Sequence, residues 1–345
     1  MKRQYDFVYL TNTPSFYKLN LCNEIAKTHR LLLVLYGYGA EAVNAEMEAS
    51  RNFRFDYYFL NEGNSNSRSK WQTFKRLIGL MRKTDCRRVI YAGWFAPEYD
   101  IYAFLSPKRR NVMVCESSIF DVSFRGVPGM VKKAIIRRMS AVLPSGKPHD
   151  ELFQSIDFRG KRNITGGVGI FNKPGRKEKE IHSPLRYIYV GRLVDVKNTS
   201  LLIDVFNANG KPLTIVGSGP LEKELKQKAE KNISFTGFVD NNKLWEVYQS
   251  HDVFVLPSYY EPWGLVVEEA VYWGLPVIFS DKVGSSVDMV KELGTGLVFR
   301  SKDEKSLQMS IMEMEKQFNS LYSNVMNVDW EQRDKKQVEA YTSLL

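Results

Sequence analysis

Cysteine is scarce in this sequence, and so are the patterns that mark a metal site or a membrane span. The three cysteines are odd in number and lack metal-ligand spacing, which argues against a disulfide framework or a zinc cluster and favours a reducing, cytoplasmic location. No D-x-D triplet occurs, so neither a dedicated metal site nor a cofactor is expected. No apolar run approaches the length of a membrane-spanning helix, and the first residues lack the apolar core of a signal peptide.

Negative charge is scarce in only one half of the chain. Residues 1–180 carry 31 Lys and Arg against 17 Asp and Glu, a net charge of +14, whereas residues 181–345 carry 18 against 22, a net charge of −4. A basic half predicts an anionic partner, but charge alone does not separate a membrane from a nucleic acid. Segments 70–83 and 128–139 are basic and amphipathic, which suits either a helix on an anionic membrane or a helix whose apolar stripe covers a sheet.

The length of 345 residues predicts two domains, each with enough residues for its own core. Short apolar runs alternate with helix-like segments through the first half, and such alternation predicts a parallel, doubly wound α/β sheet. The expected strands are 6–10, 31–36, 54–60, 88–92, 112–116 and 141–144. The expected helices are 16–28, 70–83, 99–105, 131–139 and 150–155.

In the second half, glycines and cations gather at the ends of predicted strands. Gly191 follows the strand RYIYV, and Arg192 and Lys197 come soon after it. Two cations converging on a tight turn suit a diphosphate. The next strand ends at the G-S-G-P turn that begins with Gly217, where a dinucleotide interpretation is weakened because Glu222 stands in place of the third glycine. A further strand ends in the segment Gly237, Phe238 and Val239, which also fits an ordinary strand-to-helix turn.

The most informative stretch is SYYEPWGLVVEEAVYW, residues 258–273, which follows the apolar strand DVFVLPS. It holds two carboxylates, Glu261 and Glu269, with seven residues between them. Pro262 suits the first turn of a helix that we expect to run from Gly264 to Trp273 and to stop at Gly274. One carboxylate would then lie at the strand-to-helix elbow and the other two turns along, at the sheet edge where open α/β folds bind ligands.

This setting resembles retaining glycosyltransferases of the GT-B fold, family 4, almost continuously from Leu185 to Phe299. The resemblance implies two Rossmann-like domains facing across a cleft, and a nucleotide diphosphate-sugar as donor. It assigns the leaving diphosphate to Arg192 and Lys197, the sugar to Glu261, and the ribose to Glu269; spacing alone does not choose Glu269 over Glu268. The implied donor-binding residues are Gly191, Gly217, Gly237, Phe238, Val239, Ser258, Pro262, Trp263, Gly264, Leu265 and Glu269.

In the first half, the loop TNTPSFYK joins the first strand to the first helix, and the matching loop of the family borders the acceptor and donor phosphates. We therefore expect Thr13, Pro14 and Ser15 on the acceptor side, although a plain helix-start turn is an equal alternative. Many relatives place a histidine near the reacting sugar. None of the four histidines lies at a suitable strand end here, so Glu116 is the candidate catalytic or structural carboxylate.

The resemblance implies an N-terminal acceptor domain over 1–172, a linker over 173–183, a nucleotide-sugar domain over 184–319, and a terminal helix over 320–345 that packs back on the first domain. We expect a metal-independent glycosyltransferase of surface polysaccharide synthesis, with a glycan or lipid-linked acceptor. It would be cytoplasmic, peripheral at an anionic membrane, and without nucleic acid. The alternatives are a nucleotide-sugar 2-epimerase of the same architecture and a non-catalytic nucleotide-sugar or anionic-membrane binder.

Overall fold

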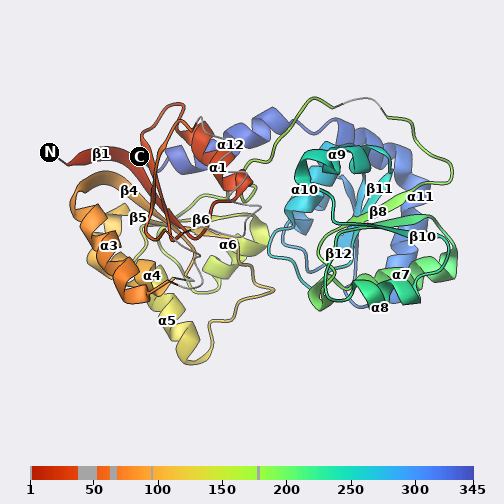
Figure 1. The fold of residues 1–345 in the computed structure, drawn as a ribbon, viewed down its shortest axis with the longest axis horizontal. Helices are drawn as coiled ribbons and strands as arrows, with labels where there is room; N and C mark the ends of the chain where they lie inside the picture. The colour runs from red at the N-terminus through yellow and green to blue at the C-terminus, as the bar shows by residue number, and fades with distance from the viewer. Residues whose placement is uncertain (1, 38–52, 63–67, 95, 177–178) are drawn as a thin grey trace. The chain divides into compact units, whose positions relative to one another are not determined.

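The computed structural model describes residues 2–37, 53–62, 68–94, 96–176 and 179–345. The chain divides into unit 1, residues 1–172 with 331–345, and unit 2, residues 173–330. Each unit contains one sheet of parallel strands (Figure 1). The segment 173–183 belongs to unit 2, and so do residues 320–330, so that only the part of the C-terminal segment from Glu331 onward joins unit 1.

Unit 1 is built on a seven-stranded sheet with the order β3-β2-β1-β4-β5-β6-β7. Its strands are β1 (Arg3–Thr11), β2 (Leu31–Leu35), β3 (Asp56–Phe59), β4 (Thr84–Ala92), β5 (Asn111–Cys115), β6 (Ala141–Pro144) and β7 (Lys161–Arg162). Its helices are α1 (Phe16–Ile25), α3 (Lys70–Arg82), α4 (Pro97–Leu105), α5 (Gly126–Ile136), α6 (Lys147–Gln154) and α12 (Trp330–Thr342), with a short 3₁₀ turn η2 (Lys108–Arg110).

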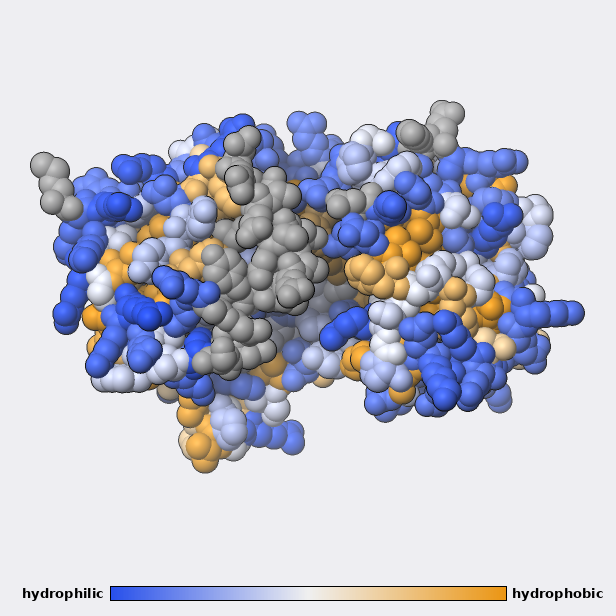
Figure 2. All heavy atoms as spheres, in the orientation of Figure 1, coloured by the Kyte–Doolittle hydropathy of each residue, from blue (hydrophilic) through white to orange (hydrophobic). Residues whose placement is uncertain are grey.

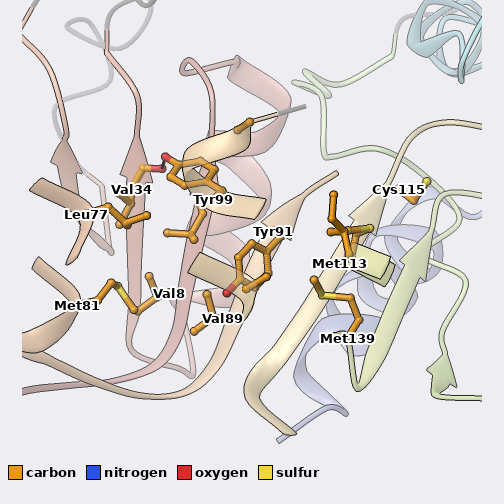
Figure 3. Packing of buried hydrophobic residues seen from close by; sticks show 14 of the residues in the cluster. Val8, Val34, Leu77, Met81, Val89, Tyr91, Tyr99, Met113, Cys115 and Met139 are labelled. Carbon is orange, nitrogen blue, oxygen red and sulfur yellow. Dashed lines mark hydrogen bonds between the residues drawn. The ribbon is translucent and has the colours of Figure 1, made fainter. Parts of the chain in front are cut away.

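Helices cover both faces of the unit 1 sheet. Because successive strand residues point to opposite sides, each strand contributes to both cores. On one face, Val8 and Val34 pack with Leu77 of α3 and Tyr99 of α4, as Figure 3 shows. On the other face, Tyr9 packs with residues of α1 and α12. Burial of each large apolar side chain contributes about 1.5–3 kcal/mol, so the core accounts for the near-continuous apolar runs of these strands.

Unit 2 is built on a six-stranded parallel sheet with the order β10-β9-β8-β11-β12-β13. Its strands are β8 (Tyr187–Val190), β9 (Leu213–Val216), β10 (Ile233–Gly237), β11 (Val253–Leu256), β12 (Val277–Ser280) and β13 (Gly296–Phe299). Its helical elements are η3 (Asp195–Lys197), α7 (Thr199–Asn209), α8 (Glu222–Lys228), α9 (Asn241–Gln249), α10 (Leu265–Tyr272), the π-helical η4 (Val287–Glu292) and α11 (Glu304–Met326). Figure 1 shows α7 and α8 on one side of this sheet and α9 and α10 on the other.

These two parallel sheets confirm the predicted α/β fold class. The strand order reverses between β1 and β4 in unit 1 and between β8 and β11 in unit 2, and such switch points are where open α/β sheets bind ligands. One predicted helix was misplaced: α5 begins at Gly126, five residues before the predicted start at 131, because Pro128 suits the first turn of a helix.

Candidate functional site

An ion pair between Lys197 and Glu261 lies at the switch point of the unit 2 sheet. Lys197 ends η3, which follows β8, and Glu261 follows β11, the adjacent strand. Their side chains are 17% and 16% exposed, so the pair is largely withdrawn from water. A lysine ammonium carries three donors, and the pair therefore keeps capacity for further anionic or hydroxyl groups.

Two hydrogen bonds to backbone carbonyls join the loops that carry this pair, one from a backbone N–H and one from an asparagine side chain. Tyr259 donates its N–H to the carbonyl of Val196 at 2.8 Å, and the Asn198 amide donates to the carbonyl of Pro257 at 3.2 Å. Asn198 adopts the left-handed conformation, with φ of 52°, which an asparagine tolerates better than most residues. The position of Lys197 is therefore fixed by the loop after β11 as well as by its own.

Gly191, Gly217 and Gly237 lie side by side at the ends of the neighbouring strands β8, β9 and β10. The N–H of Gly191 donates to Val216 at 3.0 Å, and the N–H of Gly217 donates to Gly237 at 2.8 Å. Gly217 has a φ of 131°, and a Cβ there would come within 2.0 Å of the Gly191 carbonyl oxygen. Only glycine allows this approach, so the sequence motif is explained by a backbone contact between two turns.

Glu261 is held at the elbow by its own backbone. Its N–H donates to the carbonyl of Lys282 at 3.0 Å, and its carbonyl accepts from the N–H of Gly284 at 2.9 Å. Ser258 is fully buried, and its hydroxyl lies 3.5 Å from the Glu261 carboxylate. The expected helix is shorter than predicted: α10 begins at Leu265, after Gly264 with φ of 88°, so Pro262 lies before the helix and does not open it.

The adjacent carboxylates of α10 have different surroundings. Glu268 is 4% exposed and accepts the indole N–H of Trp263 at 2.9 Å. Burial, followed by the nearby Glu268 charge, raises the pKa of Glu269 to about 7, while the Tyr248 hydroxyl, 3.5 Å away, opposes the rise. Glu269 therefore titrates near neutral pH. Trp263, which we predicted to bind the donor, is buried and contacts Glu268.

The other predicted donor-side residues lie along the same sheet edge. Arg192 follows β8 with an exposed side chain. Phe238, directly after β10, is 72% exposed, and Val239 follows it with a partly exposed side chain. An exposed aromatic next to a left-handed glycine offers an apolar ring face at the edge that carries Lys197 and Glu261.

In unit 1, Glu116 forms an ion pair with Lys18 at 3.0 Å. Both residues line a cavity of about 230 Å³ together with Asn12, Gly93 and Trp94, at the carboxyl ends of β1, β4 and β5. Burial disfavours the Lys18 ammonium, but the Glu116 carboxylate, with smaller contributions from Tyr17 and Cys22, outweighs that cost, so the pKa of Lys18 is raised. The pair occupies the switch region of the unit 1 sheet.

The predicted acceptor-side residues directly follow Asn12, which lines this cavity. Pro14 is buried, Thr13 and Ser15 are partly exposed, and Ser15 precedes α1, where its carbonyl accepts from Lys18 at 3.0 Å. Among the histidines, His149 follows β6, and it is fully buried in the first turn of α6. His149 does not line the cavity, whose charged residues are Glu116 and Lys18.

No group of three or more His, Cys, Asp or Glu residues that could hold a metal ion occurs among the described residues. Within the same ranges, none of the helices combines the length and the apolar character needed to cross a bilayer. Metal independence and peripheral membrane contact both stay predictions.

Comparison with known proteins bears mainly on unit 2. Residues 172–325 match the family described as "Glycosyl transferases group 1". Over 133 residues, 36% of this chain, the sequence is 32% identical to an uncharacterized glycosyltransferase of Methanocaldococcus jannaschii, of which the match covers 34%. Over 117 residues, 34% of this chain, it is 32% identical to a GDP-mannose-dependent alpha-mannosyltransferase of Corynebacterium glutamicum, of which 28% is covered. The chain thus spans about a third of the length of these relatives.

Solved structures resemble the whole chain. A sucrose-phosphate synthase of Thermosynechococcus elongatus has a TM-score of 0.71 at 17% identity, with 99% of each chain covered. HepE of Anabaena, solved in complex with UDP and glucose, also has a TM-score of 0.71 at 17% identity, with 98% of this chain and all of that chain covered. At this identity the likeness shows the fold, which is that of the GT-B glycosyltransferases.

Sequence reasoning missed two residues of the site. Lys18 pairs with Glu116, which is 98 positions away, and no local sequence pattern predicts that contact. The partnership of Trp263 with Glu268 was also missed, although a five-residue spacing across a left-handed glycine could have suggested it.

Proposed function

We propose that this protein is a retaining glycosyltransferase. It would move a sugar from a nucleotide diphosphate-sugar to a hydroxyl of a glycan, lipid-linked or other acceptor, in surface polysaccharide synthesis at the cytoplasmic face of a membrane. The observation that carries the proposal is the Lys197–Glu261 ion pair at the switch point of unit 2, inside the segment that matches the glycosyltransferase family. The Anabaena protein with UDP and glucose supports a nucleotide-sugar donor.

The chemical problem is to stabilise a departing diphosphate and a sugar that develops positive charge. Arg192 and Lys197 would neutralise the diphosphate, and fixed cations near developing charge lower the barrier without reorganisation. Glu261 holds Lys197 in place, which would position the ammonium for the diphosphate. The N-terminus of α10 adds a favourable dipole for an anion.

Carboxylates would serve the sugar, the ribose and the acceptor side. Glu261 would bind sugar hydroxyls and oppose the positive charge of an oxocarbenium-like transition state. Glu269 would accept hydrogen bonds from the ribose. In unit 1, Glu116 and Lys18 would face an acceptor or sugar hydroxyl from their cavity.

A donor screen tests the proposal. The purified protein is incubated with UDP-, GDP- and ADP-sugars, with and without an added hydroxyl acceptor, and the products are analysed for free nucleotide and anomeric configuration. Acceptor-dependent release of nucleoside diphosphate with a retained anomer is expected. Acceptor-independent conversion to a 2-epimer or free sugar would indicate the epimerase, and donor binding without turnover would indicate a non-catalytic binder.

Turnover should also persist in excess chelator, because Arg192 and Lys197 supply the countercharge that a divalent cation provides elsewhere. The control is the same assay with added magnesium, which should change the rate little. Complete loss of turnover in chelator, restored by magnesium, would show that these two cations are insufficient for the diphosphate.

A further inference from the structure

A basic cavity lies at the amino ends of the unit 1 strands, at the edge of that sheet opposite to the cavity of Glu116. It has a volume of about 920 Å³ and is lined by residues that precede β5, β6 and β7 together with the last turn of α5. The cavity that holds Glu116 lies at the carboxyl ends of the strands, so a full strand length, roughly 16 Å for five residues, separates the two. The basic cavity therefore has no part in the proposed sugar transfer.

Charge in this cavity is strongly unbalanced. Its lining has a single carboxylate, Asp157, against five cations: Lys108, Arg109, Lys133, Arg137 and Arg159. Asp157 pairs with Arg159 at 3.3 Å, but both side chains are more than 80% exposed, so the pair neutralises little. Repulsion among the remaining cations raises the free energy of the empty cavity, and a bound anion would remove that cost.

Four of these cations form no ion pair with any described residue. Of the four, Lys133 lies over the ring of Phe124, which leaves Lys108, Arg109 and Arg137 available for a ligand. The base of the cavity is apolar, with Ile136 and Met139 both buried. Cations around an apolar base favour an anion that carries a hydrophobic part.

Exposed apolar side chains continue from the rim of the cavity onto α4 and α5. On α4, Phe104 and Leu105 are 49% and 62% exposed, and Arg138 joins this end of α4 to α5 by donating to the carbonyls of Ala103, Phe104 and Ser106. The exposed apolar set is Ile101, Phe104, Leu105, Val127, Met130 and Val131. Figure 2 shows apolar and hydrophilic residues together at the lower edge of unit 1, where Figure 1 places α5.

The other basic amphipathic helix of the sequence, α3, differs. Leu77 and Met81 are buried against the sheet, so most of its apolar stripe belongs to the core, and Trp71, 63% exposed, is its one strongly exposed apolar residue. In α5, by contrast, Ile135 and Ile136 are buried while the preceding turns expose Val127, Met130 and Val131. The structure thus separates two segments that look alike in sequence.

We propose that the surface formed by α4, α5 and the basic cavity docks on an anionic bilayer, with the cavity holding the phosphate of a phospholipid headgroup. The exposed aliphatic side chains would enter the headgroup and acyl boundary, as the apolar residues of interfacial helices do. The cations match the negative surface of such a membrane. Single-stranded nucleic acid fits less well, because its bases need aromatic stacking faces and all but one of the exposed residues here are aliphatic.

Vesicle sedimentation tests this proposal without any donor, so failure of the donor screen leaves it standing. The protein is mixed with phosphatidylcholine vesicles, with or without phosphatidylglycerol. The triple variant Lys108→Gln/Arg109→Gln/Arg137→Gln should bind anionic vesicles roughly a hundredfold more weakly, because each surface cation contributes about a factor of five. The matched control on α3, Lys70→Gln/Lys75→Gln/Arg82→Gln, makes the same charge change and should retain binding within about fivefold.

A second pair of variants tests the apolar rim. Phe104→Ser/Leu105→Ser should weaken the binding that remains at high salt, where electrostatic attraction is screened. The control Met309→Ser/Met312→Ser, on exposed positions of α11, should leave it unchanged. If the triple variant fails to fold, as judged by its unfolding curve, Lys108→Gln and Arg137→Gln are each expected to weaken binding about fivefold.

Four results would overturn the proposal. These are equal losses in the cavity and α3 variants, equal partition onto neutral and anionic vesicles, full displacement from vesicles by millimolar inorganic phosphate, and tight binding of a single-stranded oligonucleotide that depends on the same three cations. The third result would assign the cavity to a free phosphate, and the fourth to a nucleic acid.

Discussion

Trp263 donates its indole N–H to the carboxylate of Glu268 at 2.9 Å, across the left-handed turn that begins α10. This bond gives Glu268 a structural role, since a buried carboxylate requires hydrogen-bond donors. Its neighbour Glu269 lies beside Tyr248 and has a pKa of about 7. Of two adjacent glutamates, one therefore holds the elbow in place, and the other is the candidate for the ligand.

Glu269→Gln should weaken nucleotide binding. A hydrogen bond to a charged group contributes about 1.5–3 kcal/mol, so the affinity for the nucleoside diphosphate should fall roughly ten- to hundredfold. Calorimetric titration of both proteins measures the change. Glu224→Gln, on the exposed surface of α8, is the matched control and should bind as the unaltered protein does. Unchanged affinity in Glu269→Gln would contradict the prediction that Glu269 binds the ribose.

Glu261→Gln should lower the turnover number and leave the affinity for free nucleoside diphosphate nearly intact. In the proposed reaction, positive charge develops on the sugar beside Glu261, and an interaction that strengthens only in the transition state affects turnover rather than binding. Steady-state kinetics beside calorimetry separate the two effects. Because Lys197 would neutralise the diphosphate itself, Lys197→Met should weaken nucleotide binding as well as turnover. Normal turnover in Glu261→Gln would contradict the assignment.

The raised pKa of Glu269 makes stability depend on pH. The folded protein binds the proton up to about pH 7, whereas the unfolded chain releases it near 4.5, so this contribution is present below pH 4.5 and is lost as pH rises through 7. Glu269→Gln has no carboxyl group to titrate, so its free energy of unfolding lacks this pH-dependent loss. The free energy of unfolding of the variant, relative to the unaltered protein, should rise from pH 5 to pH 8 by up to about 3 kcal/mol. Denaturant titration at both pH values measures it, and Glu224→Gln should show no such trend.

The same titration should appear in ligand binding. Hydrogen bonds from ribose hydroxyls favour the ionised carboxylate, so nucleotide binding at pH 6 should release a proton from Glu269. Calorimetry in two buffers of different ionisation enthalpy detects that release. Proton release that is undiminished in Glu269→Gln would place its source elsewhere.

Gly217→Ala should destabilise unit 2 and weaken nucleotide binding. The new Cβ would lie within 2.0 Å of the Gly191 carbonyl oxygen, so the turns after β8 and β9 would have to separate. Gly210→Ala is the matched control: its φ of 69° is also left-handed, but a Cβ there meets nothing within 4 Å. The control should lose about 1–2 kcal/mol of stability and keep its affinity, and Gly217→Ala should lose more of both. Equal losses would show that φ, and not the contact between turns, explains the glycine.

Much of the fold could be predicted from local pattern. Apolar runs predicted strands such as β2 and β6 nearly to the residue, because fully buried parallel strands are apolar on both faces. The turn at Gly217 was also predicted, and its φ of 131° disfavours a side chain. Gly264 was expected inside the helix, but it precedes α10 with a φ of 88°. The glutamates at 261 and 269 were recognised from their spacing and their flanking residues.

Tertiary structure decided the rest. Lys197 and Glu261 are 64 positions apart, and they meet because parallel strands β8 and β11, adjacent at a switch point, deliver their following loops to the same sheet edge. In unit 1, Lys18 of α1 and Glu116 after β5 also meet at the carboxyl ends of the strands, although β4 lies between β1 and β5. Two basic amphipathic segments are alike in sequence, yet α3 uses most of its apolar stripe for the core and exposes only Trp71, while α5 leaves Val127, Met130 and Val131 exposed. Periodicity shows that a helix has an apolar face, but only packing against neighbouring elements decides how much of that face is covered.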